Sequence, residues 1–571
     1  MVKIIYLNCM HYCISNYIRR KIGFIAFGLL LLVPVVNNSL FSQTANLQET
    51  IRTRVESGGI PLNLVVAGER LHARQLLPQF YENRSFQPAW SDDGKIRQEV
   101  FQLMAGIGNS TEEGLNPQDY HLDQLKELMG NKEISNALEV QDLAELDLLL
   151  TDSYLIYASH LLHGKVNPET IHSEWYANRR QASPVDILQD ALKNNQVSQS
   201  FMRLLPQQPE YRMLKDALKT YRRILAIGGW TPISAGPSMK KGEIDDRIIE
   251  LKGRLVASGD LDSSLLNFKQ TFDDALENAV KFFQKRHGLE GDGVVGKETL
   301  AALNVSAESR VNQVITNLER WRWLPEDLGR NHILINIANF ELDVIEDGNP
   351  VLIMKVIVGK NYRRTPVFSD KMTYLVFCPY WNVPQNIAVE DILPMIKKDT
   401  EYLTKQKMKV FQGWGSEAKE IDPATIEWSA VDGKNFNFRF RQDPWPGNAL
   451  GSIKFMFPNR FNVYLHDTPA KELFKKSARG FSSGCIRLEK PLEFAEYLLK
   501  SDPKWSGKKI IEAINLNVER TVRLPESLPV HLLYWTAWVN KNGIVHFRED
   551  IYDRDEAVEL ALKERPPDNE N

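Results

Sequence analysis

The stretch "YLHDTPAKELFKKSARGFSSGCIRLEK", residues 464–490, places one histidine and one cysteine 19 positions apart. A basic, helix-like segment separates His466 from Cys485, and the cysteine lies in a turn of small residues, Ser482-Ser483-Gly484-Cys485. By residue type alone, Cys485 could be a buried small hydrophobe, half of a disulfide, a metal ligand or a nucleophile. The strands around this stretch and the compartment of the protein bear on that choice.

The region around the stretch is rich in predicted strands. From about residue 331 the apolar residues recur with a period of 2, and residues 332–360 predict two strands around a turn at Glu346-Asp347-Gly348-Asn349. Four later segments continue this pattern: "MTYLVFCPYWNVP", "NFRFRQ", "SIKFMFPN" and "FNVYLHD". After Pro529 a further hairpin is expected, with its turn at residues 540–543, closing onto the same sheet.

The first half of the chain has a different, helical period. Apolar residues recur at helical spacing in residues 141–165 and 211–225, so residues 45–235 are expected to be mainly helical. A small unit at about 240–305 has two amphipathic helices followed by "EGDGVVGKETLAALN". Its Gly-x-Gly-x-x-Gly follows a helix instead of a strand, which argues against a dinucleotide site. We expect a tight turn that leads into a short helix at residues 297–303.

The N-terminus has the pattern of a targeting segment. Three basic residues at 19–21 precede an apolar run at 22–36, which is short for a bilayer span, so a cleaved signal peptide is favoured over an uncleaved anchor. Export would leave two of the four cysteines, Cys378 and Cys485, outside the targeting segment that contains Cys9 and Cys13. The remaining pair could bridge each other, or one thiol could be kept free for chemistry. Because the net charge is -3, nucleic acid is not an expected partner.

The positions of His466 and Cys485 are compatible with a nucleophilic pair. His466 ends the predicted strand at 461–466, and a helix is expected soon after Cys485. Two elements that end at one rim of a sheet can bring an imidazole and a thiol within hydrogen-bond reach. The N–H groups around Gly484 and Cys485 could then face an oxyanion, and Arg487 could bind a carboxylate or stabilise the thiolate. Spacing alone leaves an inert core cysteine equally open.

A family resemblance favours the nucleophile. "H-D-T … R-G-F-S-S-G-C-I-R-L" resembles the signature of the L,D-transpeptidase catalytic domain, the YkuD-like fold. Residues 379–394 and 441–459 also resemble this family, and residues 80–90 and 530–539 resemble its large multidomain Gram-negative branch. The small helical unit is similar to the peptidoglycan-binding domain 1 family. The residues that carry this second resemblance are Ala279, Phe283, Gln284, Gly288, Leu289, Asp292, Gly293, Gly296, Thr299 and Leu303.

The resemblance implies a role for each residue of the signature. Cys485 would be the nucleophile and His466 the base, while Ser483, Gly484 and Arg487 would fill the turn positions of the motif. Tyr464 matches a tyrosine near the reaction centre, although a packing role is equally open. Asp467 stands where smaller members often have glycine. Because a bridge to Cys485 would silence the nucleophile, Cys378 is expected to be a core thiol.

The resemblance also implies a reaction and its partners. Cys485 would take the acyl group of a donor tetrapeptide stem as a thioester, and the amine of an acceptor stem would complete a 3→3 cross-link in peptidoglycan. Neither a metal nor an organic cofactor is expected, since a thiol and an imidazole suffice for acyl transfer. The alternatives are an L,D-carboxypeptidase or a lipoprotein-attaching enzyme of the same fold, or a non-catalytic wall-binding scaffold. The protein is expected in the periplasm, with membrane contact only through an uncleaved N-terminal segment.

The expected fold class is α+β and multidomain, with a helical scaffold, a three-helix wall-binding module and a β-rich catalytic domain. A helical lid is predicted between the two motifs at 379–394 and 441–459, contributing Trp414 or Trp428 to the donor site. The expected divisions are a signal peptide or anchor at 1–43, the scaffold at 44–238, the module at 239–306, the catalytic domain at 328–515 with its lid at about 385–440, and a C-terminal β extension at 516–571.

Overall fold

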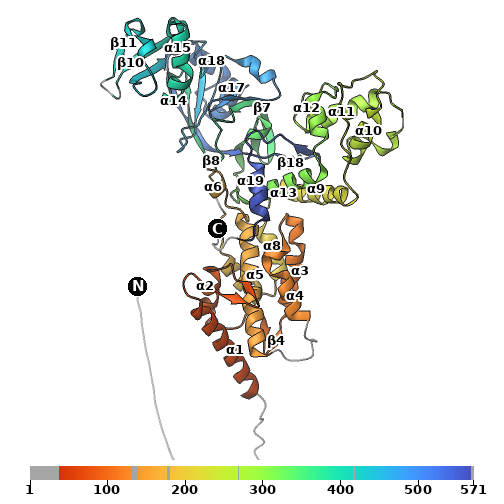
Figure 1. Ribbon diagram of the computed structural model, residues 1–571. Coiled ribbons are helices and arrows are strands. Elements are labelled where there is room, and N and C mark those ends of the chain that lie inside the picture. Colours follow the sequence, from red (N-terminus) through yellow and green to blue (C-terminus); the bar gives the residue numbers. More distant parts are fainter. Residues whose placement is uncertain are drawn as a thin grey trace, which may run out of the picture.

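The computed structural model describes residues 38–566 except 131–138, 177–179, 268, 414 and 416–417. The expectations for the N-terminal targeting segment, with Cys9 and Cys13, and for Trp414 therefore lie outside the described residues. Within the described ranges, the helices are all too short or too polar to cross a bilayer. Figure 1 shows a column of helices below, with the β-rich domain and a small helical module above it on opposite sides.

The column is most of the helical scaffold, arranged around one buried helix, α5 (Val140–His163); α6 (Pro168–Ile171) and α9 (Pro209–Ala226) lie above it (Figure 1). Almost all of that helix, α5, is buried, and its carboxylates bind backbone of the preceding segments. Asp152 accepts hydrogen bonds from the N–H of Ala73 (2.7 Å), and Asp147 from that of Trp90 (2.8 Å). The helices are α1 (Asn38–Ser57), α2 (Leu76–Asn83), α3 (Gln98–Gly108), α4 (Leu122–Gly130), α5 (Val140–His163), α6 (Pro168–Ile171), α7 (Pro184–Lys193), α8 (Val197–Leu204) and α9 (Pro209–Ala226), with short hairpins β1 (Val65–Val66)–β2 (Glu69–Arg70) and β3 (Ser91–Asp92)–β4 (Lys95–Ile96).

The small module contains the predicted helices. They are α10 (Arg247–Ala257), α11 (Asp274–Arg286) and α12 (Lys297–Leu303), and α13 (Ala307–Arg322) leads from the module to the catalytic domain. The glycine motif makes the expected turn, with Gly293 at φ +79°. Its N–H donates to Gln284 Oε1 (2.8 Å), and the Gln284 amide donates to Asp292 (2.8 Å). The turn is therefore tied to α11 by hydrogen bonds inside the module.

The β-rich domain, which we expect to be the catalytic domain, is built on one large sheet. Among the described residues its strand order is β15-β7-β16-β14-β13-β8-β17-β5-β6, and a further pairing of β6 with β7 closes the sheet on itself. Both sides of β17 are paired, with β8 and β5. The strands are β5 (Asn331–Asn336), β6 (Glu341–Glu346), β7 (Asn349–Gly359), β8 (Phe368–Phe377), β13 (Ile453–Met456), β14 (Leu465–His466), β15 (Gly480–Ser482), β16 (Ile486–Leu488) and β17 (Arg520–Leu533), and α17 (Pro491–Leu499) and α18 (Gly507–Asn515) precede β17.

Two expectations for this domain need correction. Residues 332–360 form most of three strands, because Phe340 in a left-handed conformation (φ +54°) reverses the chain before the predicted turn at 346–349. The predicted boundary at residue 516 is also wrong. It places strand β17 in a C-terminal extension, whereas β17 lies between β8 and β5 in the large sheet.

The insertion at 385–440, for which we predicted a lid, is a mixed helix-and-strand unit with its own core; we keep the name lid for it. Its first half is helical, as predicted, but its second half pairs into a sheet of order β11-β10-β12-β9. "NFRFRQ" is therefore a lid strand, and it lies outside the catalytic sheet. The elements are β9 (Trp381–Asn382), α14 (Gln385–Ile387), a π-helical turn (Ala388–Ile392), α15 (Leu393–Lys398), α16 (Tyr402–Lys405), β10 (Met408–Gln412), β11 (Lys419–Ile421) and β12 (Phe438–Gln442).

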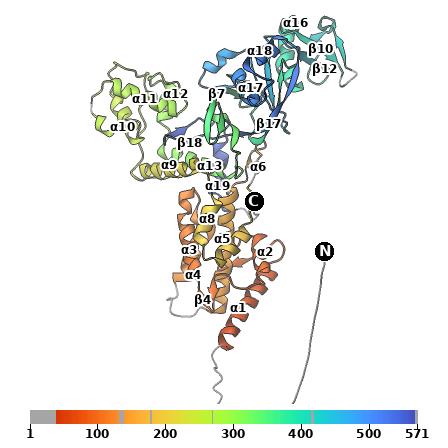
Figure 2. The same cartoon turned by 180° about the vertical axis from the view of Figure 1, so that it is seen from behind.

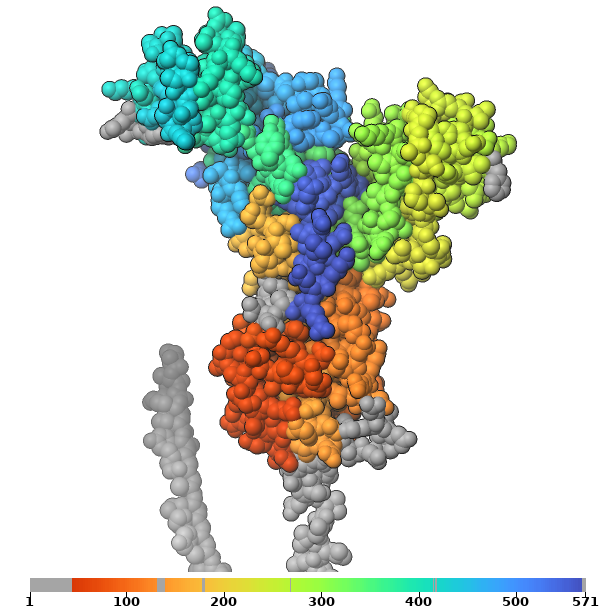
Figure 3. Space-filling view, in the orientation of Figure 1, coloured from red at the N-terminus to blue at the C-terminus, as the bar shows by residue number. Residues whose placement is uncertain are grey.

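The C-terminal residues join the three bodies. The predicted hairpin, β18 (Ala537–Val539) and β19 (Val545–Phe547), forms a two-stranded sheet of its own, so the expectation that it closes onto the large sheet is wrong. It packs at the base of the module, and α19 (Asp555–Lys563) runs down to the scaffold (Figure 2). Arg548 donates to the Arg286 carbonyl of the module (2.9 Å) and to Asn339 of the catalytic domain (2.7 Å). In the space-filling view this segment fills the centre between the other parts (Figure 3).

Candidate active site

The signature residues lie on one face of two neighbouring parallel strands. Strands β14 and β16 are paired with Leu465 opposite Ile486 and His466 opposite Arg487. Side chains alternate along a strand, so Tyr464 and His466 share a face with Cys485 and Arg487. The sequence separation of 19 positions is thus bridged by a parallel pairing, with Cys485 immediately before β16.

This face forms the floor of a cleft of about 550 Å³. The cleft brings together all the signature residues predicted from the sequence, namely Tyr464, His466, Ser483, Gly484, Cys485 and Arg487. The lid forms the opposite wall. Its lining residues are Trp381, Asn386, Ile387, Asp391, Ile392 and Tyr402.

The two tryptophans proposed for the lid have different outcomes. Trp414 lies outside the described residues. Trp428 is 5% exposed, belongs to the core of the lid, and donates from its indole to the Pro423 carbonyl (3.0 Å). Because it faces inward, Trp428 does not line the cleft, and Trp381 is the lid tryptophan that does.

The His466 ring is buried and held in one tautomer. It is 4% exposed, and its Nδ1 lies 2.5 Å from the Asp467 carbonyl, which can only accept a hydrogen bond. Nδ1 therefore carries the proton and Nε2 has the free lone pair. Burial, together with a smaller effect of the neighbouring Arg487 cation, lowers the pKa of His466 to about 3. The imidazole is neutral at ordinary pH and can accept a proton.

Asp467 holds the backbone that carries this histidine. Its carboxylate accepts from the N–H of Ser452 (2.8 Å) and Thr468 (2.7 Å), and pairs with Lys471 (2.6 Å). These contacts fix the turn after β14 to the start of β13. The Asp467 carboxylate therefore helps to position His466, at a site where smaller members of the family often have glycine.

The Cys485 thiol is uncharged in the resting site. Burial raises the pKa of the Cys485 thiol, although hydrogen bonds from the Tyr464 N–H and hydroxyl and the nearby cations of Lys454 and Arg487 favour the thiolate. Within the described residues no hydrogen bond joins the His466 ring to Cys485. The resting pair is therefore a neutral thiol and a neutral imidazole, so ionisation of the sulfur would accompany reaction.

Lys454 is a site residue that sequence reasoning missed. It lies opposite His466 on β13, and its ammonium is 3.8 Å from the centroid of the Tyr464 ring. Burial lowers the pKa of Lys454, and a negative charge on Cys485 would favour its protonated form. Lys454 and Arg487 therefore flank His466 on both sides, which favours a thiolate and disfavours an imidazolium. The signal in the sequence was a lone cation in the otherwise apolar strand "SIKFMF".

The turn that carries Cys485 is closed by its own hydrogen bonds. Gly484 has φ +112°, which favours glycine. Its N–H donates to Ser482 Oγ (3.2 Å), and that hydroxyl donates to the Cys485 carbonyl (2.5 Å). The Gly484 N–H is therefore used inside the turn, and of the two amides considered from the sequence only that of Cys485 is left for a substrate oxygen.

Cys378 is separate from this site. Both cysteines of the described residues are free thiols. Cys378 is 3% exposed, and its Sγ is 3.2 Å from the Ile514 carbonyl, below the sheet. Burial raises its pKa. The expectation of an unbridged core thiol agrees with this geometry.

Comparison with known proteins assigns the domains. Residues 330–510 match the family described as "L,D-transpeptidase catalytic domain", residues 245–303 match "Putative peptidoglycan binding domain", and residues 75–218 match "Scaffold domain". The chain therefore contains a catalytic domain of the YkuD family of L,D-transpeptidases together with a peptidoglycan-binding domain. The resemblance read from the signature residues is confirmed.

Individual relatives agree with this assignment. A curated protein of Haemophilus influenzae, described as "Putative L,D-transpeptidase", is 35% identical over 299 residues, which are 51% of this chain and 59% of that protein. The chain thus spans 59% of the length of this relative. Solved L,D-transpeptidase structures from Xylanimonas cellulosilytica and Stackebrandtia nassauensis are 15% and 17% identical, cover 52% and 53% of this chain and 98% and 97% of theirs, and have TM-scores of 0.17 and 0.20. The assignment depends on the sequence matches.

Proposed function

We propose that the protein is an L,D-transpeptidase that forms 3→3 cross-links in peptidoglycan through a Cys485 thioester. The observation that carries the proposal is the shared face of β14 and β16, where Tyr464, His466, Cys485 and Arg487 line one cleft. The catalytic and peptidoglycan-binding domains on one chain support peptidoglycan as the substrate. An enzyme that acts on the wall works outside the cytoplasm, so we propose a periplasmic protein exported by its N-terminal segment.

Acylation begins from the neutral pair. As a donor tetrapeptide enters, the Cys485 proton passes to His466 Nε2 and the sulfur attacks the carbonyl carbon of the third stem residue. Lys454 and Arg487 stabilise the sulfur anion as it forms, because both cations favour the thiolate. The Cys485 N–H faces the developing oxyanion. The bond to the terminal D-alanine then breaks, and His466 returns its proton to the leaving amine, which leaves a thioester.

Deacylation completes the cross-link. The side-chain amine of the third residue of an acceptor stem attacks the thioester carbonyl, and His466 takes a proton from it. The sulfur leaves as a thiolate and regains its proton from the imidazolium. With water as the acceptor the same steps would release a tripeptide, the L,D-carboxypeptidase outcome. With a protein amine they would attach a lipoprotein to the wall.

Mass spectrometry of muropeptides incubated with the full chain tests the proposal. Dimers joined 3→3 support the transpeptidase, whereas tripeptides alone indicate the carboxypeptidase. If the muropeptides stay unchanged and no carbapenem adduct forms on Cys485, the remaining interpretation is a non-catalytic wall-binding scaffold. A Cys485→Ala variant is the matched control and should give no product in any of these assays.

A further inference from the structure

A buried threonine holds the nucleophile peptide from behind. Thr365 is fully buried; its hydroxyl donates to the Gly484 carbonyl (2.8 Å) and accepts from the Gly359 N–H (2.9 Å). The Gly484 carbonyl and the Cys485 N–H belong to one peptide unit, which is planar and trans, so they point in opposite directions. The bond to Thr365 therefore sets the direction of the Cys485 N–H.

A tyrosine from the C-terminal segment holds Thr365 in turn. The Tyr552 hydroxyl donates to the Gly359 carbonyl (2.7 Å) and accepts from the Thr365 N–H (3.2 Å). It thereby ties together both ends of the loop 359–365. The loop is tightly closed, because a Cβ on Gly359 would lie 2.1 Å from the Arg363 carbonyl. A shift of the phenol would move the threonine that holds Gly484.

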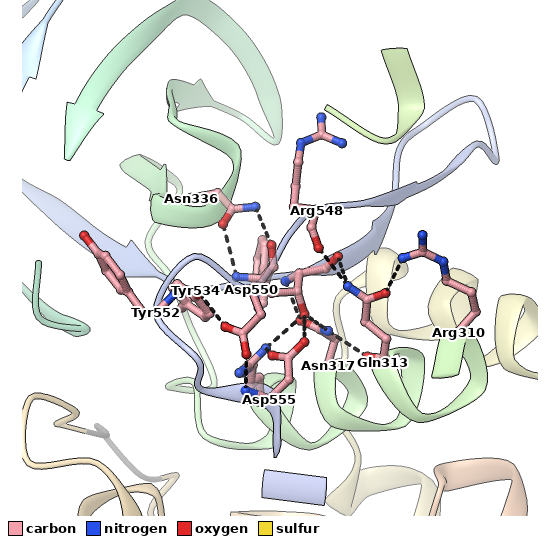
Figure 4. A network of polar contacts seen from close by, with 12 residues as sticks. Arg310, Gln313, Asn317, Asn336, Tyr534, Arg548, Asp550, Tyr552 and Asp555 are labelled. Atoms are coloured by element: carbon pink, nitrogen blue, oxygen red, sulfur yellow. Dashed lines mark hydrogen bonds and ion pairs between the residues drawn. The ribbon is translucent and has the colours of Figure 1, made fainter. Parts of the chain in front are cut away.

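Tyr552 is itself fixed by a buried network outside the matched family region, which ends at residue 510. Its N–H donates to the Tyr534 hydroxyl (2.9 Å), which donates to Asp550 (2.6 Å). Figure 4 shows Tyr552 beside this network, which continues through Asp555 and Thr536 to Asn317 and Gln313 of α13. Arg554 stacks 5.0 Å from the Tyr552 ring and donates to Glu174 of the scaffold (3.1 Å).

We propose that Thr365 and Tyr552 are positioning residues for acyl transfer, which aim the Cys485 N–H at the oxyanion of the acylation step. This inference rests on the proposed function and deepens it. The Cys485 N–H has no acceptor among the described residues, and the Gly484 N–H is occupied by Ser482. The C-terminal segment is therefore part of the catalytic apparatus as well as a link between domains.

The test compares two reactions of the same sulfur in the full chain. Acylation by a carbapenem forms an oxyanion, whereas alkylation by iodoacetamide does not, and intact-protein mass spectrometry gives both rates. Loss of one oxyanion donor costs about 10²–10³-fold in rate, and a misdirected donor costs less. We expect Thr365→Val to slow acylation by roughly 10- to 100-fold, with alkylation nearly unchanged. Thr365→Ser, which keeps the hydroxyl, should restore most of the acylation rate.

Tyr552→Phe should act in the same direction with a smaller effect, roughly 3- to 10-fold on acylation. The matched control is Tyr497→Phe. The Tyr497 hydroxyl donates to Glu346 (2.9 Å) away from the cleft, so its removal should leave both rates unchanged. If Thr365→Val does not fold, as judged by its thermal transition, Tyr552→Phe against Tyr497→Phe decides the question.

Three results would overturn the inference: wild-type acylation in the folded Thr365→Val and Tyr552→Phe variants, an equal fall in acylation and alkylation, or no recovery with Thr365→Ser. These differ from failure of the proposed function. A wild-type chain that a carbapenem does not acylate would overturn that function and, with it, the positioning role.

Discussion

The two walls of the cleft are built in different ways. The sheet wall, with Tyr464, His466 and Cys485, lies on strands whose other face is buried in the main core of the catalytic domain. The lid wall belongs to an insertion with a separate core that includes Ile392, Trp428 and Phe440. Polar contacts join the walls beside the nucleophile, where Arg363 pairs with Glu390 and Asp391 of the lid and donates to Ser483 Oγ (2.9 Å).

We expect the sheet wall to carry the reacting groups and the lid wall to control entry of the substrate. Acyl transfer needs fixed distances between sulfur, imidazole and oxyanion donor, and a paired sheet with buried hydrogen bonds provides them. Admission of a branched wall peptide needs movement. A unit with its own core can move without unpacking, provided its links to the rest are few and exposed. Arg363 is 9% exposed, but the lid carboxylates that pair with it are 61% and 41% exposed, so water and salt compete for these links.

The largest expected effect comes from the sheet wall. Cys485→Ala should lower cross-linking by roughly 10⁴-fold or more, because the sulfur is the group that bonds to the substrate. Cys378→Ala is the matched control and should leave the rate within about twofold. Both are measured as 3→3 dimers formed from purified muropeptides. If Cys485→Ala kept activity near the wild-type level, Cys485 would not be the nucleophile.

Removal of the lid wall should have the next largest effect. Replacing the insertion at about 385–440 by a short glycine–serine linker should reduce turnover by roughly 100-fold, because the donor peptide loses one side of its binding cleft. Alkylation of Cys485 should persist, since the sulfur is carried by the sheet. Normal cross-linking by the deletion variant would show that the insertion is not a lid.

The pH dependence of Cys485 alkylation tests the electrostatics of the sheet wall. Because burial raises the pKa of this thiol, iodoacetamide should react with it slowly at pH 7. The rate should still be rising at pH values above about 8.5, the pKa of a free cysteine. Lys454→Met removes a cation that favours the thiolate, so alkylation at pH 7 should fall several-fold. A pH profile of Lys454→Met that coincides with the wild type would exclude this role.

The same electrostatics predict the acid side of acylation. The pKa of His466 is about 3, so the imidazole is neutral and able to accept a proton throughout pH 5–8. The carbapenem acylation rate should therefore show no acidic limb near pH 6.5, the pKa of an ordinary histidine. A limb at that pH would mean that the ring is solvated or paired with an anion in solution.

The smallest expected effect concerns the contacts between the walls. Arg363→Gln removes the pairs with Glu390 and Asp391, and exposed pairs are worth about 0–1 kcal/mol each, so KM should change by roughly 3- to 5-fold. Lys405→Gln is the matched control, because Lys405 pairs with Asp399 inside the lid (2.8 Å). Equal KM values for the two variants would exclude a latch at Arg363.

Much of the fold could be read from local patterns. The helices of the scaffold and module, the turn at Gly293 and the hairpin at 540–543 depend on periodicity and turn residues that lie close together in the chain. The third strand within residues 332–360 was missed. The lid sheet was also not predicted, because the residue pattern of β12 does not show which strands it pairs with, and its partners β9 and β10 are far apart in sequence. Strand β17 was placed outside the catalytic domain for the same reason.

By itself the sequence determined the family of the β-rich domain and predicted the pair His466 and Cys485, because a cysteine in a glycine turn and a histidine at a strand end leave a specific local pattern. Only the tertiary structure decided the protonation of that pair and what supports it. The neutral state of His466 and Cys485, the flanking Lys454, and the bonds from Thr365 and Tyr552 arise from burial and from contacts between distant segments. Such contacts depend on sheet register and packing, which local residue patterns do not encode.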